Sequence, residues 1–150
     1  MNERVVVVNA GKMNYDHLLD FSVLSNDVQV YDDSTNAELI ERIQGATVVV
    51  TKEIPVGPEL LSQFPESVKL IVEAGTGYNN IDLDAARAKG ITVCNIPAYS
   101  TERVAHTAIM MLLNFASTMQ QQIGMLARGD RSNFTKHLQV PHTEVNGKTL

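Results

Sequence analysis

The segment that decides the fold reads Glu73-Ala74-Gly75-Thr76-Gly77-Tyr78-Asn79-Asn80-Ile81-Asp82. It follows an apolar run over residues 68–72, which has the composition of a buried strand. Asp82 can cap a helix over residues 83–89, and Gly90 can end that helix. A strand, a turn with two glycines and a helix therefore follow one another directly, which predicts a βα unit of a parallel sheet.

The two glycines of this segment indicate a turn built around backbone groups. Gly75 and Gly77 are expected to adopt positive φ angles and to let backbone N–H groups come close to a ligand. Free N–H groups at the carboxyl end of a strand suit a small anion such as a carboxylate. The same residues are equally consistent with a tight turn that binds no ligand.

The rest of the first hundred residues alternates between strand and helix patterns. Strands are expected over residues 5–8, 28–31, 47–51, 68–72 and 91–94, and helices over residues 15–24, 35–43, 58–64 and 83–89. The unbroken run of valines at residues 5–8 is typical of a strand that is buried on both faces. Repeated βα units predict an α/β fold, with a parallel five-stranded sheet and helices on both of its faces.

The composition excludes several classes of partner. Apolar side chains make up 44% of the 150 residues and the net charge is −5, so an acidic globular chain is expected to have neither nucleic acid nor anionic membrane as a partner. No segment reaches the roughly 18 apolar residues of a membrane span, and the N-terminal apolar run is too short for a signal peptide. Cys94 is the only cysteine, so we expect no internal disulfide, a cytoplasmic location and a buried, inert thiol.

The longest predicted helix covers residues 101–127, where Ser100 or Thr101 can form the cap. Residues 108–113 are apolar on every side of this helix. A helix that is apolar all round must be buried on more than one side, so a second domain or a second subunit is expected to cover it. We predict a homodimer formed through residues 101–127.

Three motifs resemble the D-isomer-specific 2-hydroxyacid dehydrogenases: residues 75–82, residues 90–97 and residues 100–105. The pattern is most similar to the branch of glycerate dehydrogenases and hydroxypyruvate reductases. The resemblance extends from about Val48 to Leu150 in unbroken order, whereas only the alternation of strands and helices agrees before Val48. The resemblance is therefore specific only for the part of the chain that follows Val48.

The resemblance implies a two-domain oxidoreductase that transfers a hydride between NAD(P)H and a small 2-keto or 2-hydroxy acid of the hydroxypyruvate or glyoxylate class. Residues 1–100 would form its flavodoxin-like substrate-binding domain. Residues 101–150 would form the crossover and dimerisation helix and the lead-in to a Rossmann cofactor domain. The 150 residues contain no Gly-x-Gly-x-x-Gly motif. We therefore expect this chain alone to bind neither NAD nor NADP tightly and to be inactive.

The resemblance also implies which residues bind substrate. Thr76 and Gly77 occupy the positions whose backbone N–H groups bind the substrate carboxylate, and Gly75 shapes that turn. Lys52 follows the third predicted strand and is expected to face the same cleft. A solvated lysine in a loop is the alternative interpretation of Lys52.

Cofactor contacts are implied at Thr76, Thr101 and Val104, of which Val104 would pack near the nicotinamide ring. Helix capping and core packing are the plain alternatives for Thr101 and Val104. The family's catalytic Arg, Glu and His come later in its chain, so no catalytic residue is assigned here. No metal site is assigned either, because the spacing of metal ligands is lacking at His17, His137 and His142. His106 lies inside the long helix and is given no catalytic role.

Two other functions remain open from the residues. One is a stand-alone carboxylate-binding module that has kept the turn and lost the cofactor domain. The other is a fragment without enzymatic activity whose apolar helix drives self-association. A longer reading frame, or the mass of the natural protein, would separate both from the dehydrogenase.

Overall fold

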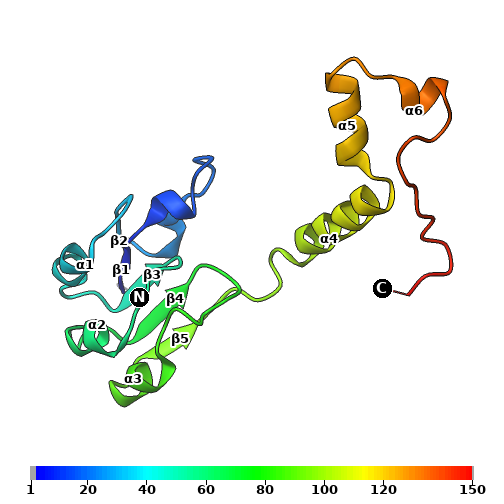
Figure 1. Cartoon of the computed structure of the whole chain (residues 1–150). Coiled ribbons are helices and arrows are strands. Elements are labelled where there is room, and N and C mark those ends of the chain that lie inside the picture. The colour runs from blue at the N-terminus through cyan, green and yellow to red at the C-terminus, as the bar shows by residue number, and fades with distance from the viewer. Residues whose placement is uncertain (1–2, 150) are drawn as a thin grey trace. The chain divides into compact units, whose positions relative to one another are not determined.

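The computed structural model describes residues 3–149, which fold into two compact units (Figure 1). The first unit is Met1–Tyr99 and the second is Ser100–Leu150. Each unit has its own secondary structure, and each is described by itself below.

The first unit is built on one five-stranded sheet in which every pairing is parallel. Its strands are β1 (Arg4–Val7), β2 (Asp27–Val30), β3 (Val48–Thr51), β4 (Leu70–Glu73) and β5 (Thr92–Cys94). The strand order β2-β1-β3-β4-β5 is the flavodoxin-like order. The predicted α/β fold with a parallel five-stranded sheet is therefore confirmed.

Three helices cover one face of this sheet: α1 (Asn36–Arg42), α2 (Pro58–Ser62) and α3 (Leu83–Ala88). Because strand side chains alternate between faces, every second residue of β1, β3 and β4 points toward these helices. The main core consists of those side chains and their helical partners, among them Val6, Val49, Ile71, Leu39, Ile43, Leu61 and Ala86.

The opposite face of the sheet carries only two 3-10 turns in the described residues, Ala10–Lys12 and Phe21–Leu24. The expected helix over residues 15–24 is therefore wrong, and within the described residues of the first unit the α-helices cover one face of the sheet and not both faces as predicted. Polar side chains compete with the helix in this segment. Asn14 exchanges two hydrogen bonds with the backbone of Leu19, and Asp20 accepts one from Ser22 N at 2.9 Å.

The prediction that Cys94 is buried is also wrong, because its side chain is exposed. Cys94 pairs with Val72 across the sheet and lies on the face that has no α-helix. Val93, the preceding residue, packs against the helix-covered core instead. An apolar strand at the edge of a sheet thus leaves one of its faces open.

The second unit contains three helices: α4 (Thr101–Ala116), α5 (Met119–Ala127) and α6 (Ser132–Thr135). The single helix expected over residues 101–127 is interrupted, because Thr118 adopts a left-handed conformation with φ 50° and ψ 36°. The Thr118 hydroxyl donates to Pro141 O at 2.6 Å, and Thr143 N donates to Ala116 O at 2.7 Å. The C-terminal segment thereby binds the chain at the break.

No residue of α4 is buried within the described part of the chain. Exposed apolar side chains of α4 and α5 include Val104, Ile109, Met110, Met111, Leu113, Phe115, Met119, Ile123 and Leu126. In residues 3–149, no helix combines the length and the apolar character that crossing a membrane requires.

Candidate functional site

Buried polar side chains gather where three neighbouring strands of the first unit end. Asn9 follows β1, Thr51 is the last residue of β3, and Glu73 is the last residue of β4. All three are at most 1% exposed. The carboxyl ends of parallel strands are the usual location of ligand sites in open α/β sheets. None of these three residues was predicted from the sequence to belong to a site.

Asn9 connects the ends of β1 and β3 and thereby places Lys52. Its Nδ2 donates to the Lys52 carbonyl oxygen at 2.6 Å, and Lys52 N donates to Asn9 Oδ1 at 2.9 Å. This pair of hydrogen bonds is partly buried and joins residues that are 43 positions apart. It fixes the backbone of the residue that was predicted to face the substrate cleft.

The side chain of Lys52 lies at the carboxyl end of β3, and only 17% of its surface is exposed. Its Nζ is 3.4 Å from Glu53 Oε1 and 5.9 Å from the centre of the Tyr99 ring. Burial lowers the pKa of the Lys52 ammonium, but the neighbouring Tyr99 and Glu53 outweigh this effect and raise the pKa above its ordinary value. Lys52 is therefore a fixed positive charge at neutral pH, and a freely solvated loop lysine does not describe it.

Residues 75–77, here called the glycine loop, are tied to the segment after β5. Ile96 N donates to Gly75 O at 2.9 Å, and the Thr76 hydroxyl donates to Ile96 O at 3.2 Å. Asn95 Nδ2 donates to Thr76 O at 2.7 Å. Within residues 3–149, the N–H groups of Thr76 and Gly77 donate to no other group, and both residues are exposed. Two backbone donors are thus available to an external acceptor.

The expectation that Gly75 and Gly77 adopt positive φ angles is wrong, because neither is among the glycines with such angles. Space explains Gly75 instead. A Cβ at this position would lie 2.9 Å from Lys52 Nζ and 3.3 Å from Glu73 Oε1. At Gly77 a Cβ would meet only Asn79 Oδ1, at an ordinary 3.5 Å. Gly75 therefore leaves room for two charged side chains beside the loop.

The structure brings Lys52 and the glycine loop together within the first unit. Thr101 and Val104 belong to the second unit, where both are exposed in the first turn of α4. Ser100 precedes this helix without a capping hydrogen bond from its side chain. Contacts of Thr101 and Val104 with a cofactor remain predictions.

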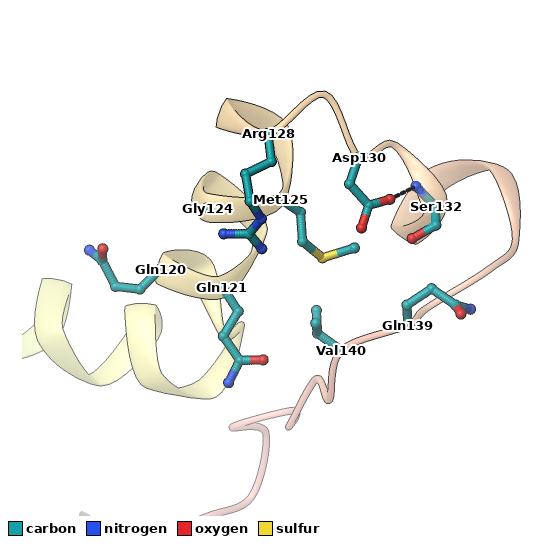
Figure 2. A pocket seen from close by; sticks show the side chains of 9 residues that line it. All are labelled: Gln120, Gln121, Gly124, Met125, Arg128, Asp130, Ser132, Gln139 and Val140. Carbon is teal, nitrogen blue, oxygen red and sulfur yellow. Dashed lines mark hydrogen bonds between the residues drawn. The ribbon is translucent and has the colours of Figure 1, made fainter.

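The second unit has a separate pocket beside α5, and Figure 2 shows the side chains around it. Its lining consists of Gln120, Gln121, Gly124, Met125, Arg128, Asp130, Ser132, Gln139 and Val140. Hydrogen bonds from the side chain and the backbone N–H of Ser132 lower the pKa of Asp130, so this carboxylate is engaged with its own chain. In the described residues, no group of three or more His, Cys, Asp and Glu side chains is arranged to hold a metal ion.

The chain is similar in sequence to one family of known proteins. A profile of the D-isomer specific 2-hydroxyacid dehydrogenase catalytic domain matches residues 5–144. Glycerate dehydrogenase from Methylorubrum extorquens is 31% identical over 118 residues, which are 77% of this chain and 37% of that protein. Hydroxypyruvate reductase from Blautia hydrogenotrophica is 40% identical over 76 residues, which are 51% of this chain and 23% of that protein.

Among solved structures, D-lactate dehydrogenase from Aquifex aeolicus, complexed with NAD and lactic acid, superposes with a TM-score of 0.72 at 25% identity. The match covers 90% of this chain and 40% of that structure. The chain thus spans well under half the length of the relatives that it matches.

Proposed function

The chain belongs to the D-isomer specific 2-hydroxyacid dehydrogenase family, and on this premise we propose that it is the substrate-binding part of such an oxidoreductase. The complete enzyme would transfer a hydride between NAD(P)H and a small 2-keto or 2-hydroxy acid. The names of the relatives, glycerate dehydrogenase and hydroxypyruvate reductase, favour the hydroxypyruvate or glyoxylate class. In this proposal residues 1–100 bind the substrate, and residues 101–150 lead to a cofactor domain.

The carboxylate of the substrate binds at the glycine loop. The N–H groups of Thr76 and Gly77 donate to its oxygens, and the ammonium of Lys52 supplies the opposite charge. Hydrogen bonds between charged or backbone donors and a carboxylate are among the stronger ones in proteins. The observation that carries this assignment is the pair of exposed N–H groups, unengaged within residues 3–149, next to a fixed lysine.

NAD or NADP is the cofactor of the complete enzyme, and it supplies or accepts the hydride when bound. Thr101 offers a hydroxyl and Val104 an apolar side chain, 64% exposed, which fit the edge of a planar ring. Thr76 is the third residue for which we propose a contact with the cofactor. The 150 residues contain no glycine-rich loop that could hold a pyrophosphate. This chain alone is therefore expected to bind the cofactor weakly and to catalyse no turnover.

A homodimer through residues 101–127 would cover the exposed apolar side chains of α4 and α5. A cytoplasmic location agrees with the single unpaired thiol of Cys94, since reducing compartments keep such thiols free.

A pair of substitutions at Thr76 tests the carboxylate site. Thr76→Pro removes the backbone donor, whereas Thr76→Ala removes only the hydroxyl and keeps the N–H group. The dissociation constant of hydroxypyruvate, measured by NMR titration of the 150-residue chain, should rise about tenfold or more in Thr76→Pro and change little in Thr76→Ala. Equal affinities of Thr76→Pro and the unsubstituted chain would show that the anion binds elsewhere.

A further inference from the structure

Glu73 is a buried carboxylate to which the proposed binding of substrate assigns no role. Its side chain has no exposed surface, and it ends β4 two residues before the glycine loop. A carboxylate removed from water needs hydrogen bonds or an opposite charge nearby, because burial of an isolated charge is costly. The groups around Glu73 supply hydrogen bonds.

Two segments of the site donate hydrogen bonds to Glu73. Glu53 N donates to its two carboxylate oxygens at 3.0 and 3.3 Å. Asn80 Nδ2 donates to Glu73 Oε2 at 2.9 Å and also to Ile54 O at 2.8 Å. Glu73 therefore joins the turn after β3, which carries Lys52, to the segment that follows the glycine loop.

The turn after β3 depends on this carboxylate. Glu53 has a φ angle of 59°, a left-handed conformation that residues with a side chain rarely adopt. The hydrogen bond from Glu53 N to Glu73 compensates for this conformation. Because Glu53 directly follows Lys52, the conformation also sets the direction in which the chain leaves the lysine.

Glu73 and Lys52 both approach the same glycine. A carboxylate oxygen of Glu73 and the ammonium nitrogen of Lys52 would each lie within 3.3 Å of a Cβ placed on Gly75. Opposite charges attract more strongly in a partly dehydrated site than in water. Lys52 Nζ forms its ion pair with Glu53 Oε1 at 3.4 Å, so the turn that Glu73 holds also carries the partner of the ammonium.

We propose that Glu73 is a positioning residue, which holds the turn at Glu53 and the ammonium of Lys52 beside the glycine loop so that both act on one substrate carboxylate. The inference rests on the proposed function, because it assumes that an anion binds there. Glu73 itself does not touch the substrate.

Glu73→Gln tests the inference, since it removes the charge and keeps the size of the side chain. We expect the dissociation constant of hydroxypyruvate to rise about tenfold, because a hydrogen bond to a charged group is lost. Glu66→Gln, the same substitution at an exposed position of this unit, should leave the constant unchanged.

A double-mutant cycle separates positioning from general support of the fold. In a Lys52→Ala background, Glu73→Gln should cause no further loss of affinity, because Glu73 acts through Lys52. A role in folding alone would weaken binding equally in both backgrounds and would overturn the inference. Asn80→Ala removes one donor to Glu73, should weaken binding in the same Lys52-dependent way, and replaces Glu73→Gln if that variant does not fold.

A readout without ligand keeps the inference separate from the proposed function. Trace acetylation with acetic anhydride should modify Lys52 several-fold faster in Glu73→Gln than in the unsubstituted chain, relative to exposed Lys69 in the same sample. An unchanged rate would overturn the positioning role whether or not an anion binds. Failure of the unsubstituted chain to bind hydroxypyruvate, together with faster acetylation, would reject the proposed function and retain the role of Glu73.

Discussion

Gly75 shows how a single residue sets the chemistry of the site. Its missing side chain leaves the space in which Lys52 Nζ and Glu73 Oε1 approach the loop. The sequence correctly marked this glycine, but it suggested a backbone reason where the structure has a steric one. Asn9 and Glu73 escaped prediction because their partners are 43 and 20 positions away in the chain. From the sequence alone, a polar residue after an apolar strand cannot be distinguished from the first residue of an ordinary loop.

Gly75→Ala should therefore displace the ammonium of Lys52 and leave the fold intact. The new methyl group would meet the flexible end of Lys52 at 2.9 Å and the buried carboxylate of Glu73 at 3.3 Å, so the free energy of unfolding should fall by about 1–3 kcal/mol. The dissociation constant of hydroxypyruvate should rise about tenfold as the charge moves away. Gly57→Ala is the matched control, because a Cβ there meets nothing within 4 Å. Equal affinity of the two variants would argue against a role of Lys52 in binding.

At the scale of elements, the helices with local start signals were predictable. Thr35 caps α1 together with Glu38, and the Asp82 side chain accepts a hydrogen bond from Ala85 N at 2.8 Å at the start of α3. These caps act within one turn of the chain, so the sequence contains them in full. Two helix predictions failed, the one over residues 15–24 and the unbroken one over residues 101–127. Side-chain hydrogen bonds at Asn14 and at Thr118 stabilise other conformations there, and helical periodicity does not reveal such bonds.

The exposed apolar side chains of α4 lead to a prediction about association. We expect the 150-residue chain to exceed the mass of one chain in sedimentation equilibrium at micromolar concentration, because burying such a side chain contributes roughly 1.5–3 kcal/mol. Phe115 is 83% exposed, so its replacement should hardly change the stability of the single chain. Phe115→Glu should weaken the dimer at least about tenfold.

Ser62→Glu is the control for this substitution, because Ser62 is an exposed polar residue of the first unit and lies outside residues 101–127. It should leave the association unchanged. The mass of a single chain at every concentration would contradict the prediction.

At the scale of the whole molecule, the order of βα units along the chain is sufficient to predict the fold class. Parallel strands joined by right-handed crossovers allow few topologies, and the flavodoxin-like order is one of them. The unequal covering of the two sheet faces was not predictable, because it depends on which residues of the Asn14 segment form a helix. The proposed carboxylate site lies where β3 and β4, two inner strands of this sheet, end.

The most direct test of this carboxylate site is a titration of the isotope-labelled 150-residue chain with hydroxypyruvate, followed by amide NMR. The largest shifts of amide signals should be those of the N–H groups of Thr76 and Gly77. The signal of the Lys52 ammonium group should shift as well. Hydroxyacetone, which has the same keto and hydroxyl groups and no carboxylate, should cause none of them. Equal shifts with both compounds, or shifts confined to the pocket at residues 120–140, would contradict a carboxylate site at the glycine loop.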